Sequence, residues 1–150
     1  MEFQDVVSQR RMVRSFSTDQ VPQSLLDRIL ANAQRAPSAG FSQGWAFVVL
    51  VGPDETAPFW DAVADPHWLA APDRPGLLRA PVIVVPCSDE AAYRARYAEA
   101  DKAATARLSG PWWLVDTSFA TMLILLSAVD AGLGALFFGL RQREAQVRAA

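Results

Sequence analysis

Three arginines near the N-terminus are the side chains best suited to bind an anion. Arg10, Arg11 and Arg14 form the one basic cluster of a 150-residue chain whose 14 Lys and Arg are set against 16 Asp and Glu, for a net charge of -2. Guanidinium groups bind phosphate through charge-assisted hydrogen bonds, and a cluster of this size suits a single phosphate. Alternatively, the arginines complement the carbonyl end of a short helix that precedes them. The nearly balanced charge argues against binding to nucleic acid or to an anionic membrane surface.

A second candidate site is the stretch RAPSAGFSQGW (35–45), in which charged residues are nearly absent. The small residues Ser38, Ala39 and Gly40 would let the backbone approach a planar ligand closely and direct amide donors at its edge. Gln43 can both donate and accept hydrogen bonds at the rim of a heterocycle. The alternative is an ordinary connection between a helix and a strand, in which glycine supplies an unusual backbone conformation.

The chain offers few side chains for nucleophilic or acid–base catalysis. Its one histidine (His67) and one cysteine (Cys87) cannot assemble a Cys/His metal cluster or an internal disulfide. No G-x-S-x-G elbow accompanies His67, and GLGALFFG (132–139) has its third glycine misplaced for a dinucleotide fingerprint. We therefore predict no catalytic side chain and no metal ligand, and we expect a bound cofactor to supply any chemistry. The single cysteine, and an N-terminus without the apolar core of a signal peptide, predict a cytoplasmic protein.

Short apolar runs predict the strands of a central sheet. AFVVLVG (46–52) and PVIVVPC (81–87) are rich in β-branched residues and bounded by Gly or Pro, as expected for interior strands covered on both faces. ALFF (135–138) is predicted to be a further interior strand. Three candidate strands without repeats or linkers favour one domain over the whole chain, of the α+β class with mixed α/β layers.

Helices and loops are expected to flank this sheet. Amphipathic spacing predicts a helix that begins near Pro22 and ends before Pro37. APFWDAVA (57–64) suggests a short helix, and PHWLAAPDRPG (66–76) is predicted to be a loop because of its three prolines. DEAAYRARYAEADKAATARL (89–108) is rich in Ala and in charged residues, which indicates a solvent-facing helical segment.

The most apolar segment (116–140) raises the question of a membrane span. Its uninterrupted apolar or weakly polar part, 117–129, is shorter than the roughly twenty residues that cross a bilayer. Asp130 and Gly132 interrupt it at the point where a bilayer would penalise them. We therefore predict a fully buried core helix over about 114–131, capped by Gly132, and no membrane contact.

The chain resembles the FMN-dependent nitroreductase family in three motifs, which are RRMVRSF (10–16), APSAGFSQGW (36–45) and DAGLGALFFG (130–139). Their order and separations match the family over nearly the whole chain. The resemblance implies a nitroreductase-like FMN-binding fold and a homodimer with FMN at the subunit interface. It also implies an oxidoreductase that takes hydride from NADH or NADPH and reduces nitroaromatic, quinone-like or related electron-poor substrates in a ping-pong cycle. Family members usually continue beyond the part that corresponds to 141–150, so the C-terminal strand of the family is expected to be absent here.

The same resemblance implies which residues bind FMN. The first motif would hold the phosphate, the ribityl chain and the pyrimidine end of the ring. The turn would lie beside the ring, in part reached from the other subunit, and the third motif would point a backbone N–H at the flavin N5 region. The implied residues are Arg10, Arg11, Met12 and Arg14 in the first motif, Pro37, Ser38, Ala39, Gly40, Phe41 and Gln43 in the second, and Phe137, Phe138 and Gly139 in the third.

Two positions depart from the family pattern and keep other functions open. Phe41 stands where many members have Asn, and Gly44 where they have Pro, so an aromatic surface replaces a polar contact. Phe41 could close the face on which a substrate stacks, which would make this a flavin-binding or storage protein without turnover. A flavin-consuming or dehalogenating relative, and a structural domain without a cofactor, are further alternatives. We expect substrate specificity to lie in residues 88–112.

Overall fold

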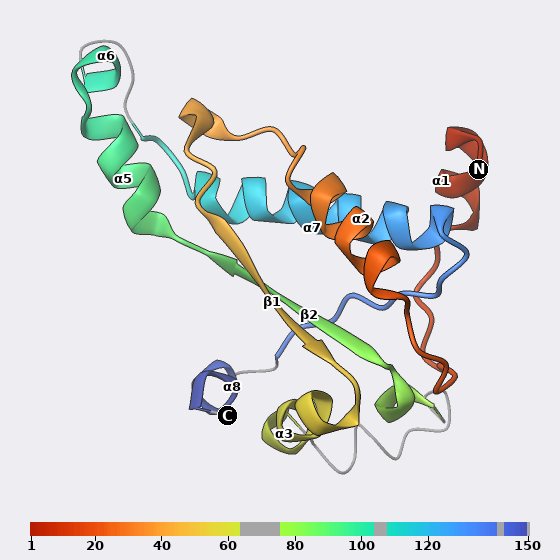
Figure 1. Ribbon diagram of the computed structural model, residues 1–150. Coiled ribbons are helices and arrows are strands. Elements are labelled where there is room, and N and C mark those ends of the chain that lie inside the picture. Colours follow the sequence, from red (N-terminus) through yellow and green to blue (C-terminus); the bar gives the residue numbers. More distant parts are fainter. Residues whose placement is uncertain (64–75, 104–107, 141–142, 150) are drawn as a thin grey trace.

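A two-stranded antiparallel sheet lies at the centre of the chain, between two groups of helices (Figure 1). Helices α2 (Gln23–Ala33) and α7 (Trp112–Asp130) lie on one side of it, and α3 (Pro53–Val63) and α8 (Glu144–Ala149) lie on the other. This layering confirms the predicted α+β class with a central sheet. The computed structural model describes residues 1–63, 76–103, 108–140 and 143–149.

The two strands of the sheet are strands that the sequence predicts. β1 (Trp45–Val51) pairs with β2 (Val82–Ser88) in a register that places Trp45 opposite Ser88 and Val51 opposite Val82. The expectation that both faces are covered is wrong for β1, because Val48 is 50% exposed. The first half of β1 alternates between half-buried and exposed residues, which is the pattern of a strand with one face on the core.

The predicted strand over 135–138 does not form. Ala135 makes one isolated parallel bridge with Met12, and the residues that follow it are irregular. The prediction is wrong because a strand needs a continuous ladder of backbone hydrogen bonds, and the N-terminal segment supplies only one rung. That segment then turns away and makes its next bridge from Ser15 to Gly76.

Helix α7 confirms the core helix predicted over 114–131. Helix α2 packs along it, where the small side chains of Ala33 and Ala120, both fully buried at 0% exposure, allow the close approach. Gly132 ends the helix in the left-handed conformation, with a φ of 76°, as the glycine cap requires.

The expectation that α7 is fully buried is wrong, because one face is open. Leu114, Phe119 and Met122 are 52%, 50% and 46% exposed. In the part of the chain that the structure describes, α7 is also the one helix long and apolar enough to cross a membrane. Its other face packs on α2 and on the sheet, so the open face is a surface available to a partner.

A second core lies on the other side of the sheet and joins α3 to the C-terminal segment. Its buried members are Phe59, Trp60, Val63, Leu77 and Ile83. The partly buried Phe138, Leu140 and Val147 pack against them. Helix α3 confirms the short helix that the sequence predicts in this region, although it begins earlier, at Pro53.

Helix α5 (Glu90–Ala98) confirms that the charged segment is helical. The prediction that this segment faces solvent is wrong at one position. Tyr93 is 0% exposed, because α5 packs on α7 and on the 3-10 turn η1 (Ala39–Phe41). A short helix, α6 (Ala100–Ala103), follows it. Residues 104–107 of that segment, and residues 66–75 of the loop predicted over 66–76, with His67, lie outside the described residues.

Candidate functional site

The arginines of the first motif follow helix α1 (Phe3–Gln9). Arg10 is the C-cap of that helix, and its N–H donates to the Val6 carbonyl oxygen at 3.1 Å. Arg11 and Arg14 lie beyond the helix and are exposed, so complementing the helix end accounts for Arg10 alone. Among the described residues, none of the three arginines forms an ion pair with a carboxylate. Arg14 donates from Nη1 to the Met12 carbonyl oxygen at 3.4 Å. Its other guanidinium N–H groups, with those of Arg10 and Arg11, are therefore available to an anion.

The N-terminal segment brings these arginines next to the third motif. Val13 N–H donates to the Ala135 carbonyl oxygen at 2.9 Å, and Phe137 N–H donates to Met12 Sδ at 3.4 Å. Gly134 permits this approach, because a methyl group at its position would lie 3.0 Å from the Val13 side chain. The structure thus brings the first and third predicted regions together.

The three residues of the third motif that were expected at the flavin differ in their exposure to solvent. Phe137 is 58% exposed, and a methyl group at Gly139 would meet no described atom within 4 Å. Phe138 points inward instead and stacks on Trp60, with 5.9 Å between the ring centroids. Phe137 and Gly139 are therefore accessible to a ligand, while Phe138 belongs to the core.

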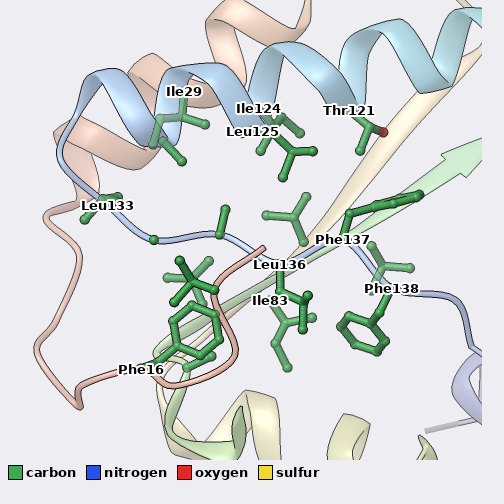
Figure 2. Close-up of a pocket in the computed structure, with 18 of the residues that line it drawn as sticks. Phe16, Ile29, Ile83, Thr121, Ile124, Leu125, Leu133, Leu136, Phe137 and Phe138 are labelled. Carbon is green, nitrogen blue, oxygen red and sulfur yellow. The ribbon is translucent and has the colours of Figure 1, made fainter. Parts of the chain in front are cut away.

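A cavity of about 730 Å³ lies between α7, β2 and the third motif. That volume is typical of pockets for small organic ligands. Val13 and Ser15, on either side of Arg14, line it, and no residue of the 37–43 turn does. Figure 2 shows its largely apolar walls, which include Phe16, Ile29, Ile83, Thr121, Ile124, Leu125, Leu133, Leu136, Phe137 and Phe138.

The turn of the second motif has a strained backbone. Gly40, Phe41 and Gln43 have φ values of 64°, 53° and 50°. Non-glycine residues in this left-handed region each cost about 1–2 kcal/mol, which surrounding contacts must offset. Phe41 is 77% exposed, and Gln43 and Pro37 are exposed as well. The turn therefore presents mainly side chains to its surroundings.

The backbone donors of the turn are largely used inside the protein. Ser38 closes the turn, because its hydroxyl accepts the Gln43 N–H at 2.8 Å and its carbonyl oxygen accepts the Phe41 N–H at 2.9 Å. The N–H of Ser42 donates to the Ala39 carbonyl oxygen at 3.2 Å. These amides are not free to meet the edge of a ligand, so the exposed side chains of Phe41 and Gln43 are what the turn offers.

Three residues that the sequence interpretation did not single out hold the turn in place. Asp116 on α7 accepts two hydrogen bonds at Oδ2, from Ala39 N–H at 2.7 Å and from the Tyr93 hydroxyl at 2.6 Å. Arg96 on α5 donates from Nε to the Gly40 carbonyl oxygen at 3.0 Å. Asp116 is 3% exposed. The signal that could have identified it is a charged residue within an apolar helix, since a buried carboxylate requires donors.

Within one chain the turn lies far from the arginines. The turn is bonded to Asp116 near the start of α7, whereas the N-terminal ammonium is bonded to Asp130 at its end, at 2.8 Å. At about 1.5 Å per residue, these two carboxylates are about 21 Å apart along the helix axis. In Figure 1 the orange turn that contains residue 40 lies at the start of α7, and α1 lies at the other end of that helix. A single chain therefore brings the first and third predicted regions together and keeps the second region, the 37–43 turn, away from both.

The hydroxyl of Tyr93 should make stability depend on pH in the alkaline range. Burial, with the hydrogen bond to Asp116, raises the pKa of Tyr93 to about 12. The protonated phenol makes its full contribution to the free energy of unfolding below its ordinary pKa of about 10. The difference between this pKa and the pKa in the folded state corresponds to about 3 kcal/mol. We expect the free energy of unfolding to fall between pH 10 and pH 12, and Tyr93→Phe to remove that part of the fall. Denaturant titrations at several pH values test this, and equal slopes in both proteins would contradict it.

A glycine at position 40 should be required for a second reason besides its φ. A methyl group at Gly40 would lie 2.9 Å from Tyr97 Cε2, whereas at Gly52, with a φ of 79°, it would meet no described atom within 4 Å. We expect Gly52→Ala to cost about 1–2 kcal/mol from strain alone, and Gly40→Ala about 1 kcal/mol more. The excess should disappear in a Tyr97→Ala background. The test is the free energy of unfolding of Gly52→Ala, Gly40→Ala, Tyr97→Ala and the double variant with Gly40→Ala and Tyr97→Ala. Equal losses of stability at both glycines would refute the prediction.

Comparison with known proteins gives one family and several relatives. The sequence profile of the Nitroreductase family matches residues 7–150. A "Putative NADH dehydrogenase/NAD(P)H nitroreductase" of Methanothermobacter thermautotrophicus is 28% identical over 153 residues, which cover 98% of this chain and 65% of that protein. Iodotyrosine deiodinase 1 of Homo sapiens is 40% identical over 53 residues, 35% of this chain and 18% of that protein. This chain therefore spans less than two thirds of either relative.

A solved structure shows the same fold. The crystal structure of a nitroreductase with bound FMN from Bacteroides fragilis superposes with a TM-score of 0.70 at 18% sequence identity. The match covers 99% of this chain and 77% of that one. At such low identity the likeness concerns the fold.

Proposed function

Because the chain belongs to the nitroreductase family, we propose that it is an FMN-dependent oxidoreductase that uses NADH or NADPH to reduce small electron-poor aromatic substrates. One observation carries the proposal. Arg10, Arg11 and Arg14 form no ion pair with a described carboxylate, and their segment lies against the third motif with its accessible Phe137 and Gly139. This arrangement offers a phosphate site and a place for a ring side by side.

The residues present fit FMN. Guanidinium groups match a phosphate in charge and geometry, and charge-assisted bonds of this kind are about twice as strong as neutral ones. The exposed ring of Phe137 and the open position at Gly139 leave room for a flat ligand. When bound, FMN would accept two electrons from NAD(P)H and return them to the substrate. The chain's own residues would bind the phosphate, orient the ring and exclude water, so no nucleophilic side chain is needed.

A second copy of the chain would complete the site. A two-fold axis that crosses the middle of α7 would set two such helices antiparallel. It would then bring the turn of each chain to the arginines of its partner, which a single chain keeps apart. Phe41 and Gln43 would reach the partner's flavin from this turn.

The exposed apolar side chains support this arrangement. The open face of α7 carries Leu114, Phe119 and Met122, and α1, which packs on α7, exposes Phe3 at 71% and Val7 at 44%. Exposed apolar surface of this kind is typical of subunit interfaces. The dimer thus accounts both for the separation of the turn and for the open face of α7.

The proposal is tested on purified protein by absorption, titration and molar mass. We expect a yellow protein, or an apoprotein that quenches the fluorescence of added FMN, with the mass of two chains in light scattering. Anaerobic NADH or NADPH should bleach the flavin band, and a quinone or nitroaromatic compound should restore it. A chain that gains no flavin absorbance with excess FMN would overturn the proposal. Tight FMN binding without bleaching would favour a storage protein.

Dehalogenation is a second candidate, favoured by the likeness to iodotyrosine deiodinase over 53 residues. It predicts that the reduced protein releases halide from a halogenated phenol. Ion chromatography of the reaction distinguishes it, since a nitroreductase would consume the nitroaromatic substrate and release no iodide.

A further inference from the structure

We propose that Asp116 is a positioning residue for the flavin, acting through the 37–43 turn without touching the cofactor. The inference rests on the proposed function, because it concerns the ring contact that the turn would make in the partner's site. Its basis is the position of one buried carboxylate oxygen between the backbone of the turn and the hydroxyl of Tyr93.

The environment of Asp116 couples its charge to the conformation of the turn. The side chain is 3% exposed, and no Arg or Lys among the described residues forms an ion pair with it. A buried carboxylate is tolerated only where donors replace its lost hydration. The donors observed are Ala39 N–H at 2.7 Å and the Tyr93 hydroxyl at 2.6 Å. Moving Ala39 would leave the charge with one donor, so the carboxylate resists any shift of the turn.

Tyr93 extends this restraint to both ends of the turn. Its hydroxyl lies 3.4 Å from Ser38 Oγ, which in turn accepts the Gln43 N–H. A methyl group at Gly44 would lie 2.8 Å from Tyr93 Cε2, so the tyrosine ring lies directly against the residue that follows the turn. The pair Asp116 and Tyr93 thus fixes the point where the turn begins and the point where it ends.

The restraint matters because the turn would otherwise relax. Phe41 and Gln43 hold φ values of 53° and 50°, which non-glycine residues adopt only when their surroundings impose them. These conformations set the directions of the two exposed side chains. Loosening the Ala39 bond would let both side chains reorient, and the ring contact would be lost even though no contact residue had changed.

Asp116→Asn and Tyr93→Phe test the inference against a matched control, Val63→Ala. The Asn amide keeps the size of Asp but offers a neutral acceptor and adds two donors. Val63 lies on α3 and is 8% exposed, so its replacement by Ala removes core packing far from the turn. Hydrogen exchange of the backbone amides of residues 38–43 in the flavin-free protein reports the turn itself, since Pro37 has no N–H. FMN affinity, from fluorescence quenching, and the visible circular dichroism of bound FMN report its effect on the ring.

We expect Asp116→Asn to speed exchange in the turn about tenfold, to weaken FMN binding about tenfold and to change the visible dichroism. Tyr93→Phe should act in the same direction and more weakly, because the Ala39 bond remains. Val63→Ala should lower stability without any of these changes. If Asp116→Asn does not fold, Tyr93→Phe decides by the same measurements.

Two outcomes would overturn the inference. In the first, exchange rises in the turn while FMN affinity and dichroism match those of Val63→Ala, which would make Asp116 a structural residue only. In the second, exchange does not change, so that no restraint exists. Failure of the wild-type chain to bind FMN would instead overturn the proposed function, and the exchange data on flavin-free protein keep the two failures distinct.

Discussion

Replacing Met122 with Glu is expected to leave the protein as separate chains that no longer bind FMN. Met122 lies near the midpoint of α7 and is 46% exposed. A residue close to the two-fold axis of a dimer lies near its own copy in the partner. One substitution at Met122 would therefore bury two carboxylates without partners. We expect the dissociation constant of the dimer to rise at least about a thousandfold. Sedimentation equilibrium and FMN titration at the same protein concentration measure both effects.

Leu78→Glu is the matched control for this prediction. Leu78 is equally apolar and 50% exposed, and it lies on the 3-10 turn η2 (Leu77–Arg79), away from α7. This variant should stay dimeric and bind FMN as the wild type does. A dimeric Met122→Glu protein would place the interface elsewhere, and a monomeric one with full FMN affinity would refute a site shared between chains.

Replacing Arg10 and Arg11 together with Ala is expected to weaken FMN binding at least about a hundredfold, because each charge-assisted bond to phosphate contributes about 1.5–3 kcal/mol. Riboflavin has the same ring and no phosphate, so its affinity should not change. The wild-type affinity for FMN should also fall with added salt, and the variant should show a smaller fall. Isothermal titration with both ligands measures these differences.

Arg94→Ala provides the charge control for the arginine pair. Arg94 is a 67% exposed arginine on α5 that pairs with Glu90. Its removal changes the net charge without touching the first motif, and FMN affinity should stay within about twofold of wild type. An equal loss of riboflavin and FMN affinity in the Arg10, Arg11 variant would show that these arginines support the fold and do not bind phosphate.

Features encoded in short stretches of the chain could be predicted from its residues. The β-branched runs around Val49 and Val84 predict the two strands, and the apolar segment closed by Gly132 predicts α7, because spacing and capping act over a few residues. The resemblance carried by three motifs is likewise confirmed by the family match over residues 7–150. The assignment of FMN contacts to those motifs stays a prediction.

Features that depend on distant partners could not be predicted. The strand expected over 135–138 fails because its neighbour at Met12 leaves after one bridge, and Tyr93 is buried because α7 and the turn cover it. The bonds from Ala39 and Tyr93 to Asp116 join residues 77 and 23 positions apart.

The amino-acid order thus specified the family, the main helix, the two strands and the cluster of arginines, because each is encoded in a short stretch of the chain. The folded chain specified where they lie. It brought the segment that carries the arginines against the third motif, through Met12 and Val13, and it placed the turn at the other end of α7. The physical reason is that α7 is a rigid rod about 28 Å long, so its length alone sets how far apart the segments packed at its two ends must be.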